Sequence, residues 1–493
     1  MERKERTKGR NAAKREGKKQ NKSGFLKGAA LIASGGFIAK LIGAVYRIPL
    51  TNLIGGYGLG LYQMVYPVYC LLLTVSATGI PSSIAKLTAE RIGQGESGKS
   101  VLKTAMKLFL IIGAVGTVLM AVFAPFLAAA QGSKSVLGGY YTLAPSVFLV
   151  SAISVFRGWF QGKNKMFPTA ASEITEQLVK VGFGLLFAYL YRSNVEKAVV
   201  ALLLAVTVSE FVALLLVYGF YRREKKKDSA KQSENEEKKI SYKSVLKLSV
   251  PVTFSSILLP LSGLIDSVLV TRLLAGFTND AVTLYGLFAG GAVTIINLPV
   301  SVCYGVAAAS VPSVAAADGK GAGKRVGFSL LVTLLLSVPS AIGLYLFAEP
   351  AAKIVFRSLR GEELATLVRL VKIFSVSAIT LSCTQTLSAC LTAQGKPQHS
   401  AVSMLIAIGV KTCLHWFWVR RFSVFGAAYA SNVCYLVAFS LDLLYNLHVL
   451  KIRKKERNRN DHGNRFGSES RGSDPSGRGE NSQGGELGSK DRR

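Results

Sequence analysis

Residues 27–60 read KGAALIASGGFIAKLIGAVYRIPLTNLIGGYGLG. This stretch is apolar and exceeds the roughly 20 helical residues that cross a bilayer. It also carries Lys40 and Arg47, which are seven residues apart. Seven residues make nearly two helical turns, so both side chains lie on almost the same helix face. A charge at the bilayer centre costs roughly 2.5–3.5 kcal/mol on insertion scales, so that face should contact protein or water.

The cationic face has two interpretations. In the first, Arg47 extends to the outer membrane interface and Lys40 pairs with a buried carboxylate. In the second, both side chains line a central cavity that accepts an anionic substrate. The stretch by itself leaves both interpretations open.

The composition places this stretch in a polytopic membrane protein. The chain has 493 residues, half of them hydrophobic, with a mean hydropathy of +0.35 and a net charge of +32. These values agree if the apolar residues form membrane spans and the cations lie in loops and tails. No cysteine pair has the spacing of a zinc site, so we expect buried free thiols and no metal site. The six cysteines all lie in apolar runs: Cys70, Cys303, Cys383, Cys390, Cys413 and Cys434.

Composition divides the chain into a basic tail (1–24), two apolar parts (25–221 and 244–450), a charged linker between them (222–243) and a polar tail (451–493). We expect both tails to be disordered, and their cations could contact anionic lipid headgroups. Each apolar part contains six runs that are long enough to span a bilayer. The twelve expected spans are 28–50, 61–86, 104–129, 138–160, 169–190, 197–220, 245–273, 282–312, 326–348, 365–392, 400–419 and 424–448.

The distribution of Lys and Arg predicts the orientation. With the N-terminus in the cytoplasm, the cytoplasmic loops carry many cations, whereas the outer loops near 52–58 and 277–280 have none. The outer segments 353–369 and 420–421 depart from this rule. The balance favours a membrane protein with both termini in the cytoplasm.

The two apolar parts repeat each other. Because six spans separate the copies, both enter the membrane in the same direction, as in a parallel duplication. The sequence therefore predicts an all-α protein with two six-helix bundles around a central cavity and alternating access, which is the plan of a transporter. The matching segments are GIPSSIA (79–85) and SVPSVA (310–315), FAPFLA (123–128) and FAEPAA (347–352), and QGKNKMFP (161–168) and QGKP (394–397).

Prolines lie at matching places in the second and eighth spans. Pro67 and Pro81 in the first copy correspond to Pro299 and Pro312 in the second. A proline removes one helical hydrogen bond and often kinks the helix. We expect these four residues to kink or break the spans and to act as hinges.

Ionisable residues deep in the spans are candidates for function. Asp266 has no nearby opposite charge in its own span, and Lys411 lies at a similar depth. We expect them to pair, either as a structural lock or as a switch that opens or titrates during transport. Glu176 and Lys180 have the i,i+4 spacing of an intrahelical ion pair.

Enzyme chemistry has no support in the sequence. Residues 93–100, GQGESGKS, match a phosphate-binding loop, but they connect two spans and leave no room for a nucleotide-binding domain. The four histidines do not cluster, and no set of a nucleophile and a base is present. We expect no catalytic site, no cofactor and no nucleic acid partner.

Five stretches resemble the stage V sporulation protein B group. That group belongs to the multidrug/oligosaccharidyl-lipid/polysaccharide exporter superfamily and is related to the bacterial lipid II flippases. The resemblance covers approximately residues 25–445. The stretches are GGFIAKLIGAVYRIPLTNLIGGYGLGLYQMVYPVY (35–69), GIPSSIAKLTAERIGQGE (79–96), FRGWFQGKNKMFPTAASEITEQLVKV (156–181), LIDSVLV (264–270) and LYGLFAGGAVTIINLPVSV (284–302).

The resemblance implies a bacterial flippase that moves an undecaprenyl-diphosphate-linked oligosaccharide across the plasma membrane, for cell-wall, spore-cortex or polysaccharide synthesis. Lys40 matches a cavity arginine of the related flippases, and Arg47 falls about one residue from another. With Arg272, these cations would bind the diphosphate. Asp266 looks like the acid that binds sodium in some members, but the Lys411 ammonium can replace the ion here.

The sequence departs from the lipid II flippases in two ways. Leu72 and Leu73 stand where those proteins have an arginine pair, and a polar tail stands in place of two further helices. Two alternatives therefore stay open beside the flippase. One is an ion-coupled multidrug exporter of the same fold, and the other is a non-transporting scaffold for cell-wall assembly.

Overall fold

The computed structural model consists of helices and short connections over the residues that it describes. Lys40 and the expected N-terminal tail lie outside them. The described ranges are 38–39, 42–43, 45–77, 79–229, 240–317 and 319–469.

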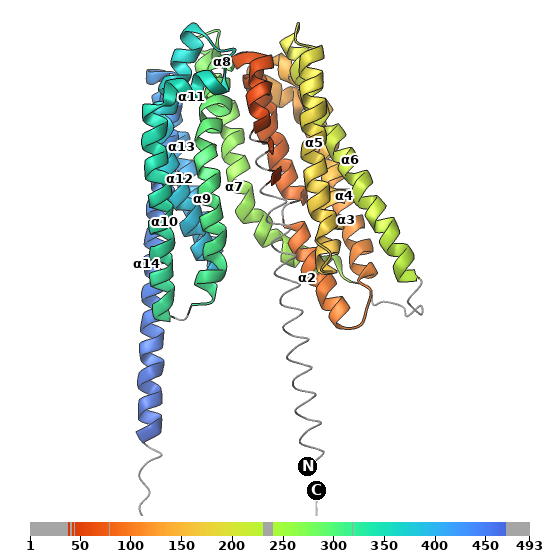
Figure 1. Ribbon diagram of the computed structural model, residues 1–493, viewed down its shortest axis with the longest axis vertical. Helices are drawn as coiled ribbons and strands as arrows, with labels where there is room; N and C mark the ends of the chain where they lie inside the picture. The colour runs from red at the N-terminus through yellow and green to blue at the C-terminus, as the bar shows by residue number, and fades with distance from the viewer. Residues whose placement is uncertain are drawn as a thin grey trace, which may run out of the picture.

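The helices form two bundles that stand side by side (Figure 1). The first bundle contains the helical residues 45–77, α2 (Ile80–Gly93), α3 (Lys99–Ala130), α4 (Leu137–Gly162), α5 (Phe167–Leu190) and α6 (Val195–Ser229), with a 3-10 turn at Lys134–Val136. The second contains α8 (Ala281–Tyr285), the π-helix η2 (Gly286–Ala292), α9 (Val293–Ala315), α10 (Gly319–Leu346), α11 (Ala348–Val355), α12 (Gly361–Ala393), α13 (Pro397–Phe422) and α14 (Val424–Glu469).

Helix α7 (Tyr242–Ala275) connects the two bundles (Figure 1). Its first turn packs Val245 into an apolar cluster with Leu87 of α2 and Val101 of α3. Further along, Lys411 of α13 contacts Asp266. One helix therefore shares a core with the first bundle at its start and an ion pair with the second bundle near its end.

The chain reverses direction within the helical residues 45–77, where we expected a loop at 52–58. Gly55 has a φ of +66°, a left-handed conformation that glycine adopts without strain. Before it, Tyr46 lies against Gly184 near the end of α5. After it, Gly58 lies against Val195 at the start of α6 and Tyr69 bonds to Glu210 further along α6. The reversal contains no extended loop, because a single glycine turns the chain and the residues on both sides of it stay helical.

The described residues are mostly helical, and many of the helices are long and apolar enough to cross a membrane. The predicted all-α polytopic fold is confirmed. Among the described residues, ten helices are long and apolar enough to cross a membrane. The first of these, Val45–Gly93, contains the reversal at Gly55. Every 18-residue stretch of α5 includes Glu173, Glu176 and Lys180, so α5 is too charged to be counted although it lies in the bundle. The total agrees with about twelve spans.

The bundles meet at the end of the molecule where α8 lies (Figure 1). A Cβ at Gly60 would overlap the carbonyl oxygen of Val282, and a Cβ at Gly286 would overlap that of Gly56. Nearby, the Asn52 Oδ1 atom accepts a hydrogen bond from the Ser358 backbone at 3.1 Å. The two halves therefore cross with backbone against backbone, a separation that only glycine permits.

Two boundaries differ from our expectation. Helix α14 continues to Glu469 and α6 continues to Ser229, so residues 451–469 and 222–229 are helical rather than disordered tail or linker. Both extensions are rich in Lys, Arg and Glu, which have high helix propensity. A helix that grows from an existing span avoids the cost of nucleation.

The prolines also behave differently from one another. Pro81 lies in the first turn of α2, whereas Pro299 and Pro312 lie inside α9, which runs through both. The loss of one hydrogen bond at each proline leaves the rest of the α9 ladder intact. The four residues are therefore not equivalent, and their role as hinges stays a prediction.

The glycine crossing predicts a large effect of adding one methyl group. Gly60→Ala should lower the free energy of unfolding by about 1–3 kcal/mol, because the backbones would have to separate. Thermal unfolding of the purified protein measures this effect. Gly219→Ala in α6 is the matched control, since nothing lies within 4 Å of its Cβ position. Equal midpoints for the two variants would contradict the close crossing.

Candidate functional site

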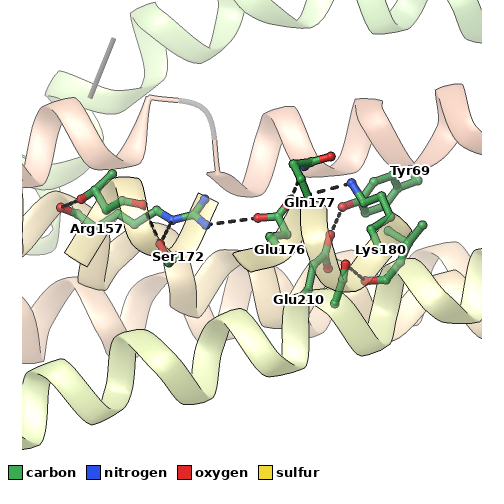
Figure 2. Close-up of polar contacts among 10 residues, drawn as sticks. Tyr69, Arg157, Ser172, Glu176, Gln177, Lys180 and Glu210 are labelled. Carbon is green, nitrogen blue, oxygen red and sulfur yellow. Dashed lines mark hydrogen bonds and ion pairs between the residues drawn. The ribbon is translucent and has the colours of Figure 1, made fainter. Parts of the chain in front are cut away.

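A chain of charged side chains connects α4 and α5 inside the first bundle (Figure 2). The Arg157 guanidinium donates to Glu176 Oε2 at 3.1 Å and to Ser172 Oγ at 2.9 Å. The Lys180 Nζ atom lies 3.8 Å from the other oxygen of Glu176. The structure thus brings Glu176 and Lys180 together and adds Arg157, whose i,i+19 separation gave no signal in the sequence.

Glu210 of α6 lies beside these charged side chains, and the charges of Glu176 and Lys180 act on it. Its side chain is 1% exposed, and the Tyr69 hydroxyl donates to its Oε1 atom (Figure 2). The other oxygen, Oε2, is buried without a hydrogen-bond partner. Sequence reasoning missed Glu210, although a single glutamate within the apolar run of α6 is itself a signal of a functional position.

A row of tyrosines extends from this network toward Arg47. The rings of Tyr62 and Tyr66 stack with centroids 5.0 Å apart, and Tyr69 follows at 5.6 Å from Tyr66. The Arg47 charge acts on both Tyr62 and Tyr66. Arg47 and the buried Glu210 therefore lie at the two ends of one continuous aromatic face.

Arg47 is partly buried and joins the two bundles. Its Nη1 atom donates to Thr294 Oγ1 of α9 at 2.6 Å. An arginine directed into protein in this way does not extend to the outer interface. The other expected binding cation, Arg272, is exposed in the last turn of α7.

The second bundle contains the expected partner of Asp266. The Lys411 Nζ atom lies 2.7 Å from Asp266 Oδ2 and donates to Ser262 Oγ at 2.5 Å. Lys411 is only 4% exposed. The buried ring of His415 adds a third group, with Nδ1 3.6 Å from the other oxygen of Asp266. The pair fastens α7 to α13.

One of the expected hinge residues lies next to α7. Gly263 contacts Pro67, and a Cβ there would come within 3.3 Å of the proline Cβ atom. The described residues contain no group of three His, Cys, Asp or Glu side chains that could bind a metal ion.

The comparisons with known proteins agree with this architecture. The family described as "Polysaccharide biosynthesis protein" matches residues 25–318, and the MatE family matches residues 251–417. The chain belongs to the polysaccharide biosynthesis protein family. Its relatives with named activities are flippases and transporters, not enzymes.

Several curated relatives come from Bacillus subtilis, and two of them have informative names. Stage V sporulation protein B is 27% identical over 354 residues, which cover 68% of each chain. Lipid II flippase MurJ is 23% identical over 457 residues and covers 87% of this chain and 83% of its own. Together with the apolar helices, these matches place the chain among the multi-pass membrane proteins of its family.

Two solved structures share the fold. An inward-facing multidrug resistance MATE family transporter aligns with a TM-score of 0.70 and 16% identity, covering 85% of this chain and 96% of its own. The lipid II flippase MurJ, in an inward closed conformation, aligns with a TM-score of 0.68 and 13% identity, covering 86% of this chain and 90% of its own. At these identities, the likeness establishes the fold alone.

The Asp266–Lys411 pair predicts a stability defect that a charge exchange reverses. Lys411→Met leaves the carboxylate buried without its cation and should cost about 3–5 kcal/mol of unfolding free energy. The exchanged double variant, Asp266→Lys with Lys411→Asp, should recover most of this loss. Thermal unfolding in detergent measures both effects. Additive losses in the double variant would show that the two side chains do not stabilise the protein as a pair.

Proposed function

We propose that this protein is a flippase that moves an undecaprenyl-diphosphate-linked oligosaccharide across the plasma membrane of a bacterium. The observation that carries the proposal is Arg47, a cation that lies within the membrane-spanning part and contacts the opposite bundle. Both termini lie in the cytoplasm in this proposal. Membership of the polysaccharide biosynthesis family and the named lipid II flippase relative support the same class of cargo.

The chemistry of arginine suits a diphosphate. A guanidinium donates two parallel hydrogen bonds to phosphate oxygens, and such charge-assisted bonds are strong where water is excluded. In the present structure Thr294, a neutral hydroxyl, accepts the Arg47 hydrogen bond. A phosphate is a stronger acceptor than this hydroxyl, so the cargo would displace Thr294. Lys40 would join Arg47, because the spacing of seven residues predicts that the two share one helix face.

This displacement gives a route to alternating access. The Arg47–Thr294 hydrogen bond joins the two bundles, so its exchange for a phosphate contact frees one bundle from the other at that point. Of the three tyrosines in the row, only Tyr66 is partly exposed, so its ring is the one that could contact the sugar.

An ion-coupled multidrug exporter of the same fold is the second candidate. Glu210 favours it, because a cationic drug requires an acid and this carboxylate has one oxygen without a hydrogen-bond partner. Against this candidate, the Tyr69 hydroxyl already occupies the other oxygen, and two cations, Arg157 and Lys180, lie along the same network. A substrate cation would meet positive charge there.

Substitution of the cations distinguishes the candidates. Arg47→Gln should weaken binding of undecaprenyl diphosphate to the purified protein by about tenfold or more, because a charge-assisted contact is lost. Lys40→Ala should weaken it in the same direction. Lys134→Gln, which removes an exposed cation, is the control. Unchanged diphosphate binding in Arg47→Gln and Lys40→Ala, with cationic drugs bound through Glu210, would favour the exporter.

A further inference from the structure

Besides Glu210 of α6 and Asp266 of α7, another carboxylate lies within the helices, in the second bundle. Asp442 of α14 is 0% exposed and lies between α12 and α13. Its Oδ2 atom accepts a hydrogen bond from Ser400 Oγ at 3.2 Å. Its Oδ1 atom is buried without a hydrogen-bond partner.

Two serine hydroxyls lie beside this carboxylate, and each of them also has another acceptor. Ser400 Oγ lies closer to Ser388 Oγ, at 2.7 Å, than to Asp442. Ser403 contacts the same carboxylate, and its hydroxyl also lies 3.0 Å from the backbone oxygen of His399. Since a hydroxyl has a single proton, neither serine can donate fully to Asp442 and to its other acceptor at once. The two hydroxyls therefore satisfy the carboxylate only in part, and neither neutralises its charge.

The nearby amide does not supply that charge or a spare proton. The Asn446 Nδ2 group donates to the Leu387 backbone oxygen at 3.1 Å and to the Asp442 backbone oxygen at 2.8 Å. Its Oδ1 atom accepts from Gln394 at 2.9 Å. Both amide protons of Asn446 are therefore directed at backbone oxygens rather than at the Asp442 carboxylate.

No ion pair neutralises Asp442 within the described residues. On α13, the His399 ring packs edge-on against Tyr445, with centroids 4.8 Å apart, and Lys396 is exposed before the first turn. On α10, Lys324 and Arg325 are exposed next to Leu450, about two helical turns further along α14. The cations of α12, Arg369 and Lys372, lie near its start, whereas Ser388 lies near its end.

We propose that Asp442, Ser400 and Ser403 form a cation site that takes a proton or a sodium ion. Either one supplies the positive charge that the buried Asp442 carboxylate lacks, and the two serine oxygens can help to bind it. Carboxylate and hydroxyl oxygens are hard ligands, which suit a small alkali ion as well as a proton. This binding does not depend on which cargo the protein transports.

Two aspartates within the helices, Asp266 and Asp442, differ in how their charge is neutralised. Asp266 is neutralised by Lys411, so it needs no ion from solution. Asp442 takes its counter-charge from outside, and its ligands come from α13 and α14. A cation that binds here therefore draws these two helices together, and its release loosens their packing.

Cation dependence of the purified full-length protein in lipid nanodiscs tests the site. In the sodium arm, thermal unfolding is followed as sodium replaces choline at constant ionic strength and pH. In the proton arm, the infrared band of protonated carboxyl groups is followed as a function of pH. We expect a response in one arm, a rise in the unfolding midpoint or a titrating band, and its loss in Asp442→Asn.

Two further variants keep the test decisive. Ser403→Ala retains the carboxylate but removes one ligand, and it should weaken sodium binding by about tenfold or shift the titration midpoint. Ser440→Ala, an exposed hydroxyl on the same helix, and Asp280→Asn, an exposed carboxyl, should leave the response as in the parent protein. The proposal is overturned if the parent shows neither response, or if Asp442→Asn and Ser403→Ala respond as the parent does. Should Asp442→Asn fail to fold, Ser403→Ala alone decides the outcome.

Discussion

The structure depends on the cost of placing a charge where water cannot reach it. Within the described spans, Glu176 is neutralised by Arg157 and Lys180, and Asp266 by Lys411. Each of these contacts joins one helix to another or fixes a side chain along its own helix. Because breaking such a contact leaves an uncompensated charge, the ionic groups restrict which helices can lie together. The cations that remain without a carboxylate partner are then candidates for binding an anion.

Arg47 is the side chain on which both this constraint and the proposed transport cycle act. Its partner is a neutral hydroxyl on the opposite bundle, not a carboxylate. Just beyond it, the two halves cross through glycine at Gly60 and Gly286. A contact that is both weakly compensated and located at the junction of two bundles can respond to a ligand without disrupting either core. In the proposed cycle the packed interior of each bundle would move as a unit, because its close packing resists gradual deformation.

Much of this arrangement could be predicted from the sequence. Depth alone suggested that Asp266 and Lys411 would meet, and the i,i+4 spacing suggested the Glu176–Lys180 contact. Arg157 was not predicted because its partner lies on another helix, and no local spacing reports a contact between helices. The hydrogen bond between Tyr69 and Glu210 was not predicted for the same reason.

The boundaries of the helices were harder to predict than their existence. The reversal at Gly55 was expected as a loop between the first two spans, but those residues are helical and Gly55 alone takes the left-handed conformation. The polar end of α14 has no apolar stripe that would predict a helix. It is helical because it continues directly from a membrane span. The surroundings of Asp442 were not predicted, because Ser400 reaches it from another helix and no local spacing reports such a contact.

Transbilayer movement of a fluorescent undecaprenyl-diphosphate-linked sugar in vesicles that contain the purified protein tests the central claim most directly. The account predicts that labelled lipid on the inner leaflet becomes accessible to an external quencher with the parent protein and not with Arg47→Gln. If the parent protein moves no labelled lipid, or if Arg47→Gln moves it equally fast, the cationic face does not carry a diphosphate.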